Sequence, residues 1–211
     1  MLEKIKIERS AHYFLQLPSK EINSVLFVIH GYAQQADEFL SEFEYLKNTQ
    51  TLVVAPEGLS LFYNKKREAV ASWMTSRHRE DEMNDYIHYL NALYEKIKRE
   101  YDFDKTAVLG FSQGVSTSLR WVCKMPENTV EYFACSGSIP PELKANDFRN
   151  QNIKAQYFYG DEDRLISTQN AEEQFLRLKE LTIEAHDHPY SGGHEVPLSC
   201  HQLIRRWASV D

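Results

Sequence analysis

The sequence predicts an α/β protein with a mostly parallel, doubly wound sheet and helices on both faces. Short apolar runs rich in β-branched residues alternate with segments of helical spacing, and each run leads into a glycine. Strands that feed helices and return to parallel strands produce this architecture. Because such folds bind ligands beyond the carboxyl ends of their strands, we expect the functional residues at those ends.

The strands are predicted in chain order from two kinds of pattern. Residues 4–8 and 12–17 alternate between apolar and polar side chains, which is typical of an antiparallel pair at the edge of a sheet. Continuous apolar runs indicate strands buried on both faces, and these are residues 25–29, 51–55, 106–109, 130–134 and 155–159. A last strand-like segment contains His186 and His188.

Helical spacing fills the intervals between the strands. The predicted helices are residues 35–47, 80–100, 113–124, 168–181 and 195–208. The longest stretch without clear periodicity, residues 58–79, contains Phe62, Trp73 and Met74. We hypothesise that these three side chains wall a substrate pocket, the alternative being a surface excursion whose aromatic rings pack into the core.

Composition limits the classes of function. The 211 residues, with no linker and no internal repeat, predict a single domain over residues 1–211. The net charge of −7 argues against nucleic acid as a partner, because binding a phosphate backbone requires a basic face. We expect no stable membrane insertion, since no run approaches about 18 apolar residues. Three cysteines without a C-x-x-C pair and an N-terminus without a signal peptide predict a cytoplasmic protein.

Ser112 is the candidate nucleophile. It stands in Gly110-Phe111-Ser112-Gln113-Gly114, which matches G-x-S-x-G, a motif that holds a serine on a sharp turn from a strand into a helix. The motif lies between a predicted strand and a predicted helix, as this interpretation requires. A serine hydroxyl also needs a histidine base within hydrogen-bond reach and an acid that orients the base.

The acid is predicted to come from Asp161, Glu162 or Asp163, which follow the strand of residues 155–159. One of these carboxylates could orient a histidine, and another could cap the helix that follows. The residues alone do not choose among them.

His194 is the candidate base. Four histidines follow the acid cluster, and only His194 stands on a loop, directly after Ser191-Gly192-Gly193. Loops deliver catalytic side chains, and the order serine, acid, histidine suits the motif.

The backbone amides of Tyr32 and Gln113 are the candidate oxyanion donors. One donor of such a site follows the nucleophile, and the other follows an early strand, here the strand ending at His30-Gly31.

Motifs for nucleotides, dinucleotides and zinc are absent from the sequence, so we expect no cofactor. His186 and His188 point to one face of a strand without a nearby third ligand, so we expect no metal either.

Taken together, these motifs resemble the phospholipase/carboxylesterase family of α/β-hydrolases, which includes the acyl-protein thioesterases. The resemblance covers nearly the whole chain, and its further matching segments are Ile29-His30-Gly31, Ala55-Pro56, Ser72-Trp73-Met74, Ser136-Gly137, Gly160-Asp161-Glu162-Asp163 and Gly193-His194-Glu195. It implies an α/β-hydrolase fold with Ser112 as nucleophile, Asp163 as acid and His194 as base. It also assigns the oxyanion hole to the amides of Tyr32 and Gln113.

The resemblance implies a serine hydrolase that cleaves carboxylic esters or thioesters of small molecules through an acyl-enzyme. The sequence leaves short esters, lysolipids and thioesters open as substrates. Two departures concern substrate preference: Tyr32-Ala33-Gln34-Gln35 stands where the family often has Gly-Asp, and Val115 replaces a common glycine. The alternatives are an α/β-hydrolase peptidase and a catalytically idle binding module. The sequence leaves the acyl length and the formation of a homodimer open.

Overall fold

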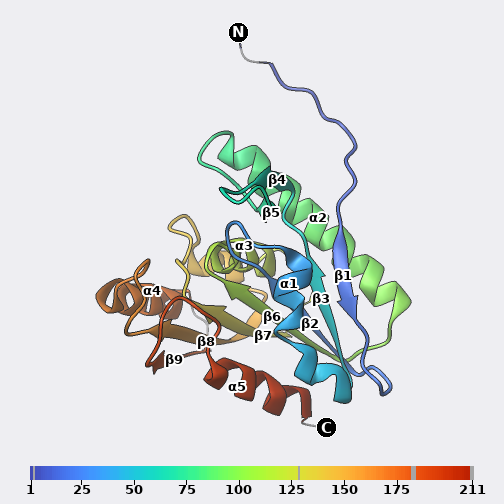
Figure 1. The fold of residues 1–211 in the computed structure, drawn as a ribbon, viewed down its shortest axis with the longest axis vertical. Helices are drawn as coiled ribbons and strands as arrows, with labels where there is room; N and C mark the ends of the chain where they lie inside the picture. Colours follow the sequence, from blue (N-terminus) through green and yellow to red (C-terminus); the bar gives the residue numbers. More distant parts are fainter. Residues whose placement is uncertain (2, 128, 182–183, 210–211) are drawn as a thin grey trace.

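A seven-stranded sheet with the order β1-β3-β2-β6-β7-β8-β9 forms the centre of the computed structural model, which describes residues 1, 3–127, 129–181 and 184–209 (Figure 1). β1 runs antiparallel to β3, and the other neighbouring strands run parallel. The strands are β1 (Tyr13–Gln16), β2 (Ser24–Ile29), β3 (Thr51–Pro56), β6 (Lys105–Phe111), β7 (Thr129–Cys135), β8 (Asn152–Gly160) and β9 (Glu184–Tyr190). The predicted fold class is therefore confirmed.

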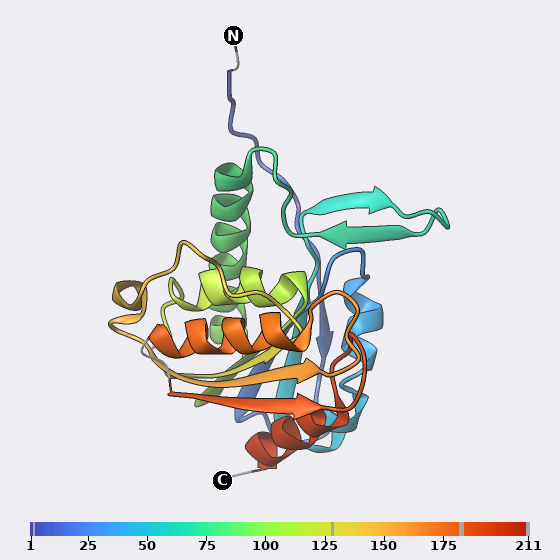
Figure 2. The ribbon, with the colours of Figure 1, turned by 90° about the vertical axis from the view of Figure 1, so that its left-hand side faces the viewer.

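Helices cover both faces of this sheet (Figure 2). One face carries α2 (Arg79–Glu100), α3 (Gln113–Val122) and α4 (Thr168–Glu180), and the other carries α1 (Ala36–Ser41) and α5 (Leu198–Ser209). Successive residues of β2 serve opposite layers, since Phe27 packs in the cluster with α2 and α3 whereas Val28 packs with α1 and α5. A strand covered on both sides needs an apolar residue at every position, which explains the continuous run.

The predicted pairing of residues 4–8 with residues 12–17 is wrong. The first segment forms no strand, and β1 pairs with β3, although β1 does lie at an edge of the sheet as predicted. Ile5 and Ile7 are 85% and 79% exposed, so the alternation in this arm reflects no buried face. Alternation predicts a strand only where a neighbouring surface can bury one set of side chains.

Two predicted helices differ in their limits. The helix expected over residues 35–47 divides into α1 and the 3-10 helix η1 (Glu44–Asn48), because the Phe43 amide bonds to the Leu40 carbonyl and tightens the turn. The last helix begins at Leu198, since the carbonyl of Pro197 accepts its first bonds from the amides of Cys200 and His201.

Residues 58–79, predicted as irregular, contain an antiparallel hairpin of β4 (Ser60–Tyr63) and β5 (Ala69–Ser72). The hairpin projects from the body of the molecule (Figure 2). At its turn, Asn64 Oδ1 accepts from the amides of Lys66 and Glu68, which stabilises a tip of polar residues. Each of these strands has only four residues, and β5 consists mostly of small side chains. Their alternation of apolar and polar residues is therefore too weak to predict strands from the sequence.

The three cysteines, Cys123, Cys135 and Cys200, are buried free thiols. Within the described residues, no helix is both long and apolar enough to cross a membrane.

Candidate active site

Ser112 occupies the tight turn between β6 and α3 with φ of 53° and ψ of −117°. Such a backbone conformation costs a non-glycine residue about 1–3 kcal/mol and persists only where the surroundings enforce it. Here the Ser112 amide donates to the Cys135 carbonyl at 2.9 Å. A Cβ on Gly114 would lie 2.0 Å from the Ile29 carbonyl oxygen, so only glycine lets α3 begin this close to β2.

His194 is oriented by Asp163. Its Nδ1 lies 2.7 Å from Asp163 Oδ2, and the two side chains are 19% and 1% exposed. An ionised carboxylate can only accept, so Nδ1 carries a proton, and in the neutral form of the ring Nε2 is then the acceptor. The ring also lies 5.0 Å from that of Phe111, measured between centroids.

The Asp163 carboxylate is stabilised in its charged form. Its Oδ1 accepts from the amides of Leu165 at 2.7 Å and Ile166 at 3.1 Å. Burial raises the pKa of Asp163, but the hydrogen bonds from His194 and from these two amides outweigh burial and leave the pKa lowered. Asp163 is therefore ionised at neutral pH and suited to hold a histidine in one tautomer.

Asp161 and Glu162 bond to Gly192 and not to His194, unlike Asp163. Asp161 Oδ1 accepts from the Gly192 amide at 3.1 Å, and the Glu162 amide donates to the Gly192 carbonyl at 2.9 Å. These bonds attach the acid loop to the loop that bears His194. The cap of α4 is Ser167, whose Oγ accepts from the Asn170 amide, so neither acidic residue caps that helix.

Ser112 and His194 line the same cavity of about 230 Å³, hereafter the Ser112 cavity. Its other lining residues are Gln113, Ser116, Ser136, Gly137, Ser138, Leu165 and Ile166. Within the described residues, no hydrogen bond joins Ser112 Oγ to the histidine ring; serine–histidine contacts of this kind commonly tighten only in the substrate complex.

Two backbone amides in segments that adjoin Ser112 have no backbone acceptor among the described residues. The Gln113 amide begins α3, where a helix leaves its first N–H groups unpaired. The Tyr32 amide donates to no backbone acceptor among the described residues. A Cβ on Gly31 would lie 3.1 Å from Ser112 Cβ, so the segment bearing Tyr32 packs directly against the serine.

The three residues predicted to wall the substrate pocket contact the segments of the two candidate oxyanion donors. Trp73 is 1% exposed and packs in the core, so its predicted role as a pocket wall is corrected to a structural one. Phe62 stacks on Tyr32 at 5.3 Å, and the Met74 carbonyl accepts from Gln113 Nε2 at 2.9 Å. None of the three lines the Ser112 cavity.

Sequence reasoning missed the actual walls of the Ser112 cavity. Ser136 and Ser138 follow β7, and Leu165 and Ile166 follow the acid loop. The position of Ser136 in the sequence could have indicated its place in the site. It directly follows β7, whose carboxyl end lies at the same edge of the sheet as that of β6. Its φ of 48° places it in the left-handed region, as a sharp turn requires.

His186 and His188, which were considered as metal ligands, bond to different partners. His188 stacks on Phe158 at 4.6 Å and shares a hydrogen bond with Gln156, whereas His186 pairs with Glu184. Across the part of the chain that the structure describes, no three His, Cys, Asp or Glu side chains are grouped to hold a metal ion.

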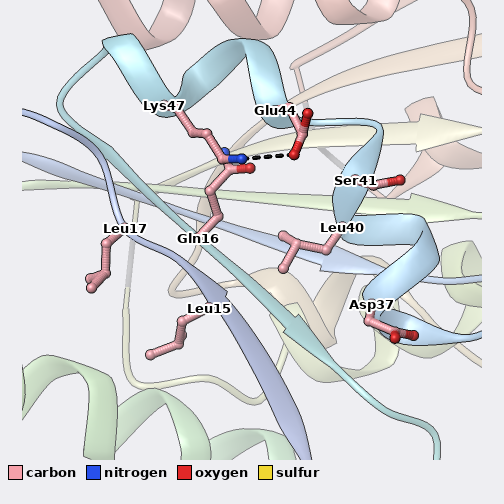
Figure 3. Close-up of a pocket in the computed structure, with 8 residues that line it drawn as sticks. All are labelled: Leu15, Gln16, Leu17, Asp37, Leu40, Ser41, Glu44 and Lys47. Atoms are coloured by element: carbon pink, nitrogen blue, oxygen red, sulfur yellow. Dashed lines mark hydrogen bonds and ion pairs between the residues drawn. The ribbon is translucent and has the colours of Figure 1, made fainter.

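A second cavity, of about 290 Å³, lies between β1 and the segment from α1 to η1 and is hereafter the β1 cavity (Figure 3). It is lined by Leu15, Gln16, Leu17, Asp37, Leu40, Ser41, Glu44 and Lys47. Lys47 Nζ pairs with Glu44 Oε1 at 2.7 Å. None of the candidate catalytic residues faces it.

The sequence profile of the phospholipase/carboxylesterase family matches residues 10–207. The chain belongs to this family. The predicted family resemblance is thereby confirmed, and the family is one of esterase- and thioesterase-type α/β-hydrolases.

Three solved structures superpose on most of this chain. Esterase PE8 superposes with a TM-score of 0.73 at 19% identity, covering 94% of this chain and 98% of its own. Zea mays acyl-protein thioesterase 2 gives 0.72 at 16% identity, covering 94% and 97%. The Bacillus cereus carboxylesterase gives 0.65 at 15% identity, covering 94% and 93%. At these identities the likeness establishes the α/β-hydrolase fold. No curated protein sequence matches the chain significantly.

Proposed function

We propose that this chain is a serine hydrolase that cleaves carboxylic esters or thioesters through an acyl-enzyme. The observation that carries the proposal is the 2.7 Å contact between His194 Nδ1 and Asp163 Oδ2, in the same cavity as Ser112 on its strained turn. Membership of a family of esterases supports the reaction class.

The reaction begins when His194 Nε2 takes the Ser112 proton as Oγ attacks the acyl carbonyl carbon. The carbonyl oxygen becomes an oxyanion, which the amides of Tyr32 and Gln113 stabilise. Collapse of the tetrahedral intermediate breaks the bond to the alcohol or thiol, which leaves with the proton from His194. Water then attacks the acyl-serine by the same steps and releases the carboxylic acid.

The Ser112 cavity favours small acyl groups. Its volume of about 230 Å³ lies below the range of roughly 300–1,000 Å³ that is usual for ligand sites. Leu165 and Ile166 give it an apolar wall, and Ser116, Ser136 and Ser138 give it a polar one. We expect kcat/KM for 4-nitrophenyl acetate and butyrate to exceed that for the palmitate ester, and the reverse order would contradict this assignment.

The test of the proposed function is the intact mass of the protein after exposure to a fluorophosphonate probe. Wild-type protein should gain one adduct, because the probe reports an activated serine without any assumption about the acyl group. Ser112→Ala should gain none, and Ser41→Ala, a serine of the β1 cavity, should label like wild type. A folded wild-type protein that acquires no adduct, or a Ser112→Ala protein that does, would overturn the proposal.

The three free thiols suit a reducing compartment, and we propose the cytoplasm as the location.

A further inference from the structure

The two proposed oxyanion donors belong to separate segments of the chain. Tyr32 follows β2, and Gln113 begins α3. Each donor must lie within about 2.7–3.1 Å of one oxyanion, so the separation of the two segments has to be maintained closely. The segment Ser72-Trp73-Met74, at the end of β5, contacts both of them.

The side chain of Gln113 holds this segment from the side of the serine turn. Its Oε1 accepts from the Trp73 amide at 3.1 Å, and its Nε2 donates to the Met74 carbonyl at 2.9 Å. Both ends of the amide group also lie within hydrogen-bond distance of Ser72 Oγ. Because an N–H donor faces Oε1 and a carbonyl faces Nε2, the orientation of the side-chain amide is determined.

The indole of Trp73 holds the other donor segment. Its Nε1 donates to the His30 carbonyl at 2.9 Å. This carbonyl belongs to the peptide unit that joins His30 to Gly31, and the next peptide unit contains the Tyr32 amide. The indole and the His30 imidazole lie 5.1 Å apart between centroids, and the indole meets Tyr86 edge-on at 6.3 Å.

His30 is itself bonded at both ring nitrogens. The Gly58 amide donates to Nε2 at 3.0 Å, so Nδ1 carries the proton and donates to the Gly31 carbonyl at 2.7 Å. Burial lowers the pKa of His30 to about 4, against the smaller opposite effect of the bond to Gly31. The ring is therefore neutral at physiological pH, as this pair of bonds requires.

We propose that Trp73 and the side chain of Gln113 are positioning residues that set the separation of the two oxyanion donors. This inference rests on the proposed function. The connection runs from the Gln113 backbone through its side chain to the Trp73 backbone, and then through the indole N–H to the carbonyl before Gly31. Gln113 thus acts twice, since its amide faces the oxyanion and its side chain holds the segment that aligns the second donor.

The experiment measures kcat and KM for 4-nitrophenyl butyrate in Trp73→Phe and Gln113→Met, which remove the bonding groups and keep most of the packing. We expect kcat to fall by about 10- to 100-fold with little change in KM, because misplaced donors weaken binding of the transition state and not of the ester. The matched control is Trp121→Phe. Trp121 is fully buried in α3, and its Nε1 donates to Asn91 Oδ1 at 3.0 Å, away from both donors.

Trp121→Phe should lower the melting temperature about as much as Trp73→Phe and leave kcat unchanged. The double variant of Trp73 and Gln113 should lose less than the product of the single losses, since both act on one geometry. Equal losses of kcat in Trp73→Phe and Trp121→Phe, or independent losses in the double variant, would overturn the inference. If Trp73→Phe does not fold, Gln113→Met decides by the same criterion.

Failure of the proposed function has a different signature. It would appear as butyrate turnover that Ser112→Ala retains, whereas failure of the positioning role would leave turnover dependent on Ser112 and insensitive to Trp73.

Discussion

The Ser112 cavity and the β1 cavity differ in what their polar groups bond to. In the β1 cavity Lys47 pairs with Glu44, Gln16 Nε2 donates to the Phe43 carbonyl at 2.9 Å, and Ser41 Oγ donates to the Glu38 carbonyl at 2.6 Å. In the Ser112 cavity a serine lies on a strained turn, and a histidine is oriented by a buried carboxylate. The Gln113 amide, at the start of a helix, has no backbone acceptor among the residues that the structure describes.

On the proposed function, the larger cavity is the one without catalytic groups. The volume of a cavity does not depend on how the groups that line it are hydrogen-bonded, whereas catalysis requires polar groups that are free to bond to a substrate. Polar groups without partners and a strained backbone lower the stability of the fold, and the surrounding structure must offset this loss. The four predictions that follow test whether this contrast between the two cavities is functional.

Ser112→Ala should give the largest effect. If Ser112, His194 and Asp163 act as a unit, kcat for ester hydrolysis should fall on the order of 10⁶-fold, since no other group can form the acyl-enzyme. Ser41→Ala makes the same chemical change in the β1 cavity and should leave kcat unchanged. Steady-state kinetics on both variants checks this, and near-wild-type turnover by Ser112→Ala would show that the contrast has no catalytic meaning.

Asp163→Asn should lower kcat by about 10⁴-fold, because an amide can stabilise the wrong tautomer of His194. Asp161→Asn should cost far less, since an Asn carbonyl oxygen can still accept from the Gly192 amide. Kinetics of the two variants measured side by side compares neighbouring carboxylates with different partners. Equal losses would mean that the acid loop acts as a whole and that Asp163 has no separate role.

His30 should make stability depend on pH. Burial, partly opposed by its bond to Gly31, keeps the pKa of His30 at about 4 in the folded protein, compared with 6.5 in an unfolded chain. Between these values the unfolded state binds more protons. The free energy of unfolding should therefore fall as pH drops through this range, by on the order of 3 kcal/mol.

Urea unfolding across the same pH range checks the His30 prediction. His30→Gln should show a flatter dependence on pH, whatever its overall stability. Glu44→Gln, in the β1 cavity, should keep the wild-type dependence because its ion pair with Lys47 is exposed. A slope unchanged in His30→Gln would assign the pH dependence to another group.

Lys47→Met should give the smallest effect. It breaks the ion pair of the β1 cavity, and exposed pairs contribute about 0–1 kcal/mol. We expect the free energy of unfolding to change by no more than this and kcat to be unchanged. A large loss of activity would reveal communication between the two cavities.

Local patterns in the sequence accounted for much of the sheet and for the serine turn. Residues 25–29 form a strand because β2 packs on both faces, and the continuous run records this burial. Gly114 marks the turn after Ser112 because a side chain there would collide with the Ile29 carbonyl. In both cases the physical cause acts over a few residues and therefore leaves a trace in their order.

Tertiary structure decided which residue meets which. Asp161 and Asp163 are chemically identical, and only the path of the acid loop directs one carboxylate to His194 and the other to Gly192. Trp73 appeared able to wall a pocket or to pack in the core, and the nearby His30 carbonyl selects the core. The alternation in residues 4–8 predicted a strand, but no neighbouring surface buries Ile5 or Ile7.

The sequence by itself thus determined the fold class, the family and the residue types available for chemistry, because backbone sterics and hydrophobic period are local properties. The sequence pointed to Asp163 only through the family resemblance. The contact of its carboxylate with His194, the walls of the Ser112 cavity and the contacts of Trp73 were decided by tertiary structure. These depend on distances between segments remote in the chain, which packing sets and no local pattern encodes.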